Sequence, residues 1–297
     1  MRVSTNEMMH SSLYAIETAY SNMSTYQNQL SSGKRINNPS DDPVGIQQLL
    51  SLQQSNSNLT QYGKMNSQAV SFLSNTDSAL SSVNNLLNQA RTLAVQAANS
   101  AFEPLSHTAL VSQIGEIITQ VSDIGNTNYS GRYIFAGQLT QTMPITNSGG
   151  TYTYQGGSQA AGNSNITLEV GANEPMAVNV SGDQVFTPLL NTLQTLQNDV
   201  ASGNTSAISQ TDIANLDTQL NNLLTVRSNV GAKIDQLNQQ SQQNGLVSLN
   251  NSQMISQIGD TNMAQAIVSL QSAQTAYQAA LSATSHSYQD SLLNFLG

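Results

Sequence analysis

Apolar residues recur in alternating steps of four and three near both ends of this chain, and this spacing constrains the fold more than any other feature. The N-terminal repeat comprises Met9, Leu13, Ile16, Tyr20, Met23 and Leu30. The C-terminal repeat comprises Met263, Ile267, Leu270, Tyr277, Leu281, Tyr288 and Phe295. Such a repeat is the seam of an α-helical coiled coil. We therefore expect residues 3–32 and 260–296 to form two helices that pair side by side.

The C-terminal segment carries a second, small-residue stripe of Ala266, Ala273, Ala276, Ala280 and Ala283. A helix with two usable faces is expected to have more than one neighbour. We expect the seam of Tyr277, Leu281, Tyr288 and Phe295 to meet the N-terminal helix. The alanine stripe would then permit close approach by another subunit.

Similar apolar periodicity predicts three interior helices. One runs from about residue 43 to residue 100, and Pro104 breaks it. A shorter helix follows and closes at Gly125, and a third covers at least residues 213–237. Three helices with apolar stripes are able to form a bundle.

Residues 133–186 differ in character, because short β-branched and aromatic runs alternate there with Gly, Asn and Pro turns. We expect strands at 133–137, 151–155, 166–170 and 176–180. An insert of about 50 residues is too short for a large core of its own. The predicted fold class is therefore mainly α, with a terminal α-helical coiled coil, a rod bundle of long helices and a small β-rich insert. The corresponding domains are 1–42 with 258–297, 43–137 with 187–257, and 138–186 facing outward.

The composition restricts the possible partners. Charged residues make up 8% of the chain, and nearly half of the residues are uncharged and polar. The chain has 17 acidic residues and only 8 basic ones. Because phosphate binding needs clustered cations, nucleic acid is excluded as an expected partner. No run of apolar residues is long enough to span a membrane or to act as a secretory signal, so neither membrane insertion nor that export route is expected. The chain has no cysteine and hence no disulfide or thiolate chemistry.

A search for catalytic patterns finds none. His10, His107 and His286 stand far apart and in no metal-binding spacing. Residues 156–160 resemble a nucleophile elbow but lack its last glycine. Asp41 and Asp42 are adjacent, and sequence neighbours do not face each other as an acid and a base must. We therefore expect no catalytic, cofactor-binding or metal site, and no enzyme.

One loop, between the first two predicted helices, has a distinctive sequence. Gly33 can end the first helix in a left-handed conformation, and Pro39 keeps Asn38 extended. Asp42 can cap the next helix, with Pro43 in its first turn. These features predict a helix–loop–helix hinge whose motif residues are Gly33, Arg35, Ile36, Asn37, Pro39, Asp41, Asp42 and Pro43.

This loop resembles that of the bacterial flagellin superfamily, whose members carry Leu-Ser-Ser-Gly-x-Arg-Ile-Asn followed by an Asp-Asp pair. The form between Pro39 and Pro43 departs from the alanine-rich version of filament flagellins. It is similar to family members that join the flagellar hook to the filament. Three further segments resemble the family, namely residues 130–137, 226–234 and 260–267. The resemblance covers almost the whole chain except residues 138–186.

The resemblance implies a structural axial protein of the bacterial flagellum, a secreted adaptor at the hook–filament junction. Its implied partners are identical subunits in a ring, flagellar hook-associated protein 1, flagellin and a flagellar export chaperone. The terminal helices would form the inner core of a tube. Few charges fit such a core, since desolvating unpaired ions costs several kcal/mol each. Two alternatives remain open: a flagellin-type filament subunit, and a secreted adhesin that binds through residues 138–186.

Overall fold

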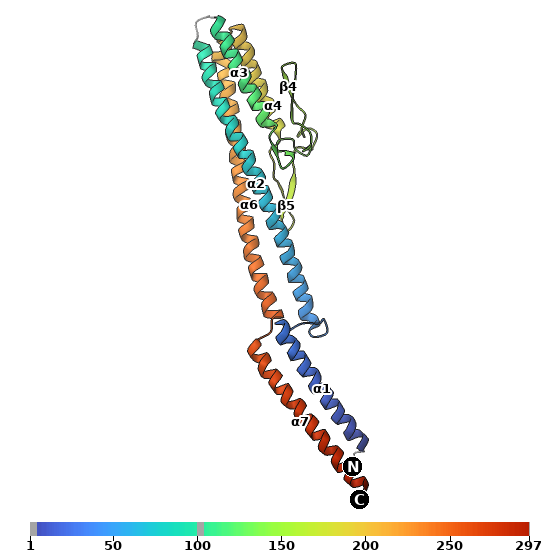
Figure 1. Ribbon diagram of the computed structural model, residues 1–297. Helices are drawn as coiled ribbons and strands as arrows, with labels where there is room; N and C mark the ends of the chain where they lie inside the picture. The colour runs from blue at the N-terminus through green and yellow to red at the C-terminus, as the bar shows by residue number, and fades with distance from the viewer. Residues whose placement is uncertain (1–4, 100–103, 297) are drawn as a thin grey trace. The chain divides into compact units, whose positions relative to one another are not determined.

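The computed structural model describes the backbone of residues 5–99 and 104–296, and the side chains of residue 7 and residues 9–99 and 107–285. The chain forms two compact units, which we call unit 1 (residues 1–58 with 246–297) and unit 2 (residues 59–245). Two long helices, α2 (Pro43–Asn99) and α6 (Ile213–Gly259), contribute to both units. The chain is mainly helical with small antiparallel sheets, which confirms the predicted fold class (Figure 1). The boundaries of the three predicted domains remain a prediction.

Unit 1 contains the two terminal helices, α1 (Thr5–Ser32) and α7 (Met263–Leu296), which lie side by side (Figure 1). This pairing confirms the two helices predicted from the 4–3 repeats. Gly33 follows the last residue of α1 with φ of +69°, the left-handed conformation that ends a helix. At the start of α7, the Asn262 side-chain oxygen accepts a hydrogen bond from the amide of Gln265 at 3.2 Å.

The face of α7 that packs on α1 differs from the sequence expectation. Ala266 and Ala273 are only 4% and 9% exposed, whereas Leu281 is 43% exposed. The packed stripe combines both predicted stripes: Ala266, Leu270, Ala273, Tyr277, Ala280 and Thr284 are buried or half-buried. Small alanines let the two helix backbones approach, which is why they occupy this seam. Tyr288 and Phe295 lie outside the residues whose side chains the structure describes.

The facing stripe of α1 is shifted in the same way. Ser12, Ile16, Ala19, Met23, Tyr26 and Leu30 are buried or half-buried, whereas Met9, Leu13 and Tyr20 are exposed. The Tyr20 ring still reaches the edge of the interface, with its centroid 6.0 Å from that of Tyr277. Each helix thus has one stripe in the seam and a second apolar stripe in solvent.

Unit 2 is a helical bundle of α2, α6, α3 (Pro104–Gly125) and α4 (Gly182–Ser202) (Figure 1). The three predicted interior helices are confirmed, and α6 continues to Gly259, well past the predicted stretch. The sequence interpretation missed α4, although its apolar stripe is regular and fully buried: Val185, Leu189, Leu193, Leu196 and Val200. This helix begins at Gly182, inside the segment predicted to be β-rich.

The core of unit 2 is one continuous apolar cluster between these helices. Leu73, Leu80 and Leu87 contribute to it from α2 and are 0% exposed. Two ion pairs join α2 to α6 beside this core: Arg91 Nε lies 2.6 Å from Asp217 Oδ1, and Arg227 Nε lies 2.9 Å from Asp77 Oδ1. The pairing of residue 77 with residue 227 and of residue 91 with residue 217 shows that α2 and α6 run antiparallel.

Three two-stranded antiparallel hairpins stand beside the bundle. They pair β1 (Asn128–Tyr129) with β2 (Arg132–Tyr133), β3 (Ile145–Ser148) with β4 (Thr151–Tyr154), and β5 (Thr167–Gly171) with β6 (Glu174–Ala177). The strands predicted at 151–155 and 166–170 are confirmed within a residue. The strand predicted at 133–137 is wrong beyond Tyr133, because residues 134–137 turn into the core, and β3 was not predicted. The predicted strand at 176–180 ends at Ala177.

A short connection leads from α4 into α6 and includes a buried acid. It consists of α5 (Thr205–Ala207) and one turn of π-helix, η1 (Ile208–Asp212). Asp212, the last residue of η1, is only 1% exposed. Burial, together with the nearby Asp199 carboxylate, raises the pKa of Asp212 to about 6.

Candidate functional site: a clasp, an exposed stripe and a groove

The predicted hinge forms a clasp in unit 1, made of residues 33–42 and residues 258–261. The backbones of the two segments form an antiparallel bridge at Lys34 and Asp260. The amide of Arg35 donates to the carbonyl of Gly259 at 2.7 Å, and the amide of Thr261 donates to the carbonyl of Gly33 at 3.0 Å. The loop after α1 is therefore tied to the loop before α7.

Charged side chains reinforce the clasp. The Arg35 guanidinium donates to the carbonyl of Ile258 from Nε at 3.1 Å and from Nη2 at 2.8 Å, and Nη2 also lies 3.1 Å from Asp42 Oδ2. Lys34 Nζ lies 2.6 Å from Asp260 Oδ1. Because these groups are partly exposed, each ion pair contributes little stability. The contacts instead position the segments, because Arg35 bridges the end of α6 to the start of α2.

The two aspartates of the motif act on different backbone groups. Asp41 Oδ2 accepts from the amides of Asn37 at 2.9 Å and Asn38 at 2.8 Å, which closes the loop on itself. Asp42 Oδ1 accepts from the amide of Gly45 at 2.8 Å and so caps α2 as predicted. This bond, followed by the bond from Arg35, holds the pKa of Asp42 below its usual range. The Lys34 ammonium, followed by Ser256, lowers the pKa of Asp260 in the same way.

Two glycines that the sequence interpretation did not single out pack closely against side chains at the clasp. Ile36 is buried, and a Cβ on Gly45 would lie 2.7 Å from its Cδ1 atom and 2.6 Å from Asp42 Oδ2. A Cβ on Gly259 would lie 3.2 Å from both terminal carbons of Leu49. Apolar periodicity gave no signal for either position, because Gly45 packs on two residues of the preceding loop and Gly259 packs on Leu49, which is distant in the sequence.

The predicted coiled-coil residues divide into two groups in unit 1. Ile16, Met23, Leu30, Leu270 and Tyr277 are half-buried in the α1–α7 seam. The others form what we call the exposed stripe, with exposed fractions of 42–57%: Met9, Leu13, Tyr20, Met263, Ile267 and Leu281. A single chain therefore leaves half of the described predicted interface in solvent.

The helices that carry the exposed stripe are almost free of charge. Glu17 is the only Asp, Glu, Lys or Arg between Glu7 and Lys34, and none occurs between Asp260 and Asp290. Exposed helix faces are ordinarily rich in charged residues. An uncharged face with an apolar stripe is typical of a surface that another protein covers.

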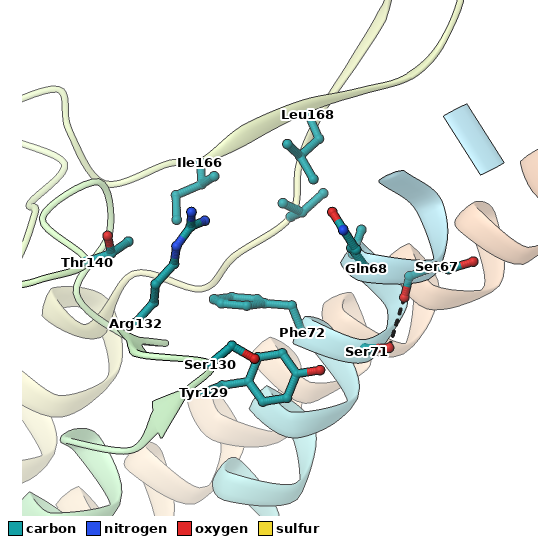
Figure 2. A pocket seen from close by; sticks show the side chains of 12 residues that line it. Ser67, Gln68, Ser71, Phe72, Tyr129, Ser130, Arg132, Thr140, Ile166 and Leu168 are labelled. Carbon is teal, nitrogen blue, oxygen red and sulfur yellow. Dashed lines mark hydrogen bonds between the residues drawn. The ribbon is translucent and has the colours of Figure 1, made fainter. Parts of the chain in front are cut away.

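A groove of about 600 Å³ opens in unit 2 between α2 and the hairpins (Figure 2). Phe72 and Tyr129 form its floor, with ring centroids 6.5 Å apart at 78°. Ile166 and Leu168 line the opposite side, and Arg132 extends into the space between (Figure 2). The sequence interpretation did not anticipate this groove, since its walls come from three distant segments. Its remaining lining residues are Ser67, Gln68, Ala69, Ser71, Ser130, Thr140 and Val178.

The structure places the histidines apart from any common site. His10 is exposed on α1, whereas His107 is buried with Nδ1 3.0 Å from the carbonyl of Val200. The side chain of His286 lies outside the described residues. Among the side chains that the structure describes within residues 5–99 and 104–296, no cluster of three potential metal ligands occurs. Within the same ranges, no helix is long and apolar enough to cross a membrane.

Comparisons with known proteins agree with these features. Residues 3–140 match the family described as the bacterial flagellin N-terminal helical region. The chain is 28% identical over 310 residues to flagellar hook-associated protein 3 of Escherichia coli, covering 95% of this chain and 96% of that protein. It is 30% identical to a Listeria monocytogenes flagellin, but over 131 residues, 44% of this chain and 46% of that flagellin. The resemblance to the flagellin superfamily, and to hook-associated protein 3 over nearly the whole chain, is thereby confirmed.

The fold is shared with solved structures. A flagellar junction protein from Legionella pneumophila superposes with a TM-score of 0.58 at 18% identity, covering 72% of this chain and all of that one. At this level of identity the likeness concerns the fold.

Proposed function

We propose that this chain, which carries the flagellin N-terminal helical region and resembles hook-associated protein 3 along nearly its whole length, is the structural adaptor between the hook and the filament of a bacterial flagellum. Its subunits assemble with identical copies through their terminal helices. The adaptor then presents one end to hook-associated protein 1 and the other to flagellin.

One observation of the structure supports this proposal above the others: the exposed stripe on α1 and α7. Its six apolar side chains are 42–57% exposed on helices that hold one acidic residue between Glu7 and Lys34 and no charge between Asp260 and Asp290. Covering such a stripe removes apolar surface from water without burying unpaired ions. The same helices already form a coiled coil within one chain, so neighbouring pairs can extend the packing.

The clasp gives this assembly a defined geometry. Arg35 contacts Ile258 and Asp42, and the backbone bridge joins Gly33 to Thr261. These contacts fix how the α1–α7 pair continues from the ends of α2 and α6 inside unit 1. Identical subunits must share that geometry in order to repeat it in a ring.

Localisation follows from the same proposal. The subunit is exported through the flagellum's own channel to the outside of the cell and is guarded in the cytoplasm by an export chaperone. Its role is mechanical and carries no catalytic step.

A filament subunit is the competing function. Two observations favour the adaptor. The similarity to hook-associated protein 3 covers 95% of this chain, against 44% for the Listeria flagellin. The chain also has Pro39 in the clasp and Pro43 at the start of α2, a form that departs from the alanine-rich version of filament flagellins.

Gene deletion followed by electron microscopy tests the proposal. We expect cells that keep their hooks, lack filaments and release unpolymerised flagellin into the medium. Expression of the intact chain from a plasmid should restore the filaments. Normal filaments in the deletion strain would contradict the adaptor function, whereas loss of filaments without flagellin release would indicate a filament subunit.

A further inference from the structure

The groove of unit 2 leaves three apolar side chains partly exposed on its walls. Phe72 approaches it from α2, and Ile166 and Leu168 approach it from the side of β5, with open space between them (Figure 2). All three pack on the main core of unit 2 but remain partly exposed. A volume of about 600 Å³ is within the range of about 300–1,000 Å³ that binding pockets commonly have.

The groove also contains a cation without a described partner. Arg132 is exposed and extends between the two apolar walls (Figure 2). The three other arginines with described side chains each form an ion pair, whereas Arg132 forms none within the described part of the chain. Glu169 follows the groove residue Leu168 on β5, but side chains alternate along a strand. The Glu169 carboxylate is therefore directed away from the groove and from Arg132.

We propose that the groove binds an exposed carboxylate and the apolar atoms around it from a second copy of this chain, with Arg132 pairing the carboxylate. An arginine fork matches a carboxylate in two-point geometry, and the apolar walls strengthen that contact by excluding water. This inference rests on the proposed function, which brings identical copies together. It deepens that function by assigning a contact between the rod portions of neighbouring subunits.

Charge complementarity identifies the second copy as the occupant. The chain holds 17 acidic and 8 basic residues, so a neighbouring copy offers acids in excess. Five carboxylates of unit 2 are exposed and have no hydrogen bond or ion pair within the described residues: Glu116, Asp123, Glu169, Glu174 and Asp235. Assembly holds these groups at high effective concentration around the groove.

The contact is heterologous, because the groove on one copy meets a different surface on the next. Such head-to-tail contacts generate a closed ring or a continuing helix, whereas a self-complementary contact stops at a dimer. A heterologous contact therefore fits an adaptor built from many copies.

Charge reversal tests the proposal in the assembled protein. Arg132→Glu should reduce incorporation of the full chain onto purified hooks at least tenfold while leaving its melting temperature unchanged. Lys64→Glu is the matched control, because it reverses another exposed cation on α2 outside the groove, and it should incorporate within twofold of the parent. In the Arg132→Glu background, changing each of the five exposed carboxylates to Lys in turn should restore incorporation in one case.

Photo-crosslinking identifies the occupant directly. A benzoylphenylalanine in place of Leu168 should yield a product of twice the subunit mass in hook-attached particles. A product with another protein, or failure of all five charge swaps to restore assembly, would overturn the second copy as occupant. Normal incorporation of Arg132→Glu, or equal loss with Lys64→Glu, would overturn the groove contact. None of these results would decide the adaptor function, which is tested separately by the filaments and the released flagellin of the deletion strain.

Discussion

Asp212 makes the stability of unit 2 depend on pH in a direction opposite to that of most carboxylates. Its ordinary pKa is 3.8 and its pKa in the folded chain is about 6, because burial and Asp199 disfavour the charge. The folded state therefore holds this proton more tightly than the unfolded state does. The stabilisation is fully present below pH 3.8 and is lost as the pH rises through 6.

The magnitude follows from the shift. Complete ionisation of Asp212 lowers the free energy of unfolding by about 3 kcal/mol, of which about 1.4 kcal/mol falls between pH 5 and pH 7.5. Asp212→Asn keeps the shape of the side chain and cannot ionise. The variant therefore does not lose the stability that the parent loses on ionisation. The unfolding free energy of Asp212→Asn minus that of the parent should be about 1.4 kcal/mol larger at pH 7.5 than at pH 5.

Urea denaturation of both proteins at the two pH values measures this difference. Taking the difference between variant and parent cancels groups such as Asp42 and Asp260, whose lowered pKa values act in the opposite direction. Asp235→Asn, which alters an exposed carboxylate on α6, is the control and should show no such change. An advantage of Asp212→Asn that is equal at both pH values would refute the reasoning.

Three further variants address the clasp and the terminal helices. Gly33→Val forces a β-branched residue into positive φ, so it should cost on the order of 1–2 kcal/mol in the clasp and impair incorporation more than export; a variant that assembles and swims like the parent would contradict this conformation. Ala273→Asp places a carboxylate in the α1–α7 seam and should cost the isolated chain several kcal/mol of pairing free energy, seen as lost helix by circular dichroism. Leu281→Asp should leave that helix signal intact and yet block incorporation, because Leu281 belongs to the exposed stripe; equal helix loss in both variants would contradict the assignment of the two faces.

The helices could be predicted because their apolar spacing records burial directly. The 4–3 repeats located α1 and α7, and Pro104 and Gly125 marked both ends of α3. Spacing does not say which of two stripes meets which neighbour. The alanines of α7 lie in the seam because small side chains let the two helix backbones approach. The sequence alone does not show whether such a stripe packs on a helix of the same chain or on another subunit.

The missed features depend on contacts between distant segments. The apolar stripe of α4 is regular. The helix was nevertheless not predicted, because it adjoins β-like sequence and contains Pro188, a residue that usually interrupts helices. Local rules for capping and turns predicted the roles of Gly33, Asp42 and Pro43, whereas Asp41 was singled out by the family resemblance. The contact of Arg35 with Ile258 and the close packing of Gly259 on Leu49 come from tertiary folding, and so does the groove around Arg132.

Thiol labelling tests most directly whether neighbouring subunits cover the exposed stripe. The chain has no cysteine, so Leu13→Cys and Leu281→Cys each introduce a single reactive group. Both variants should first be shown to support motility. We expect a maleimide to label both thiols in the isolated chain, and neither thiol in hook-attached particles until those particles are dissociated. Equal labelling of the attached and the isolated protein would contradict the account, because the stripe would then remain in solvent after assembly.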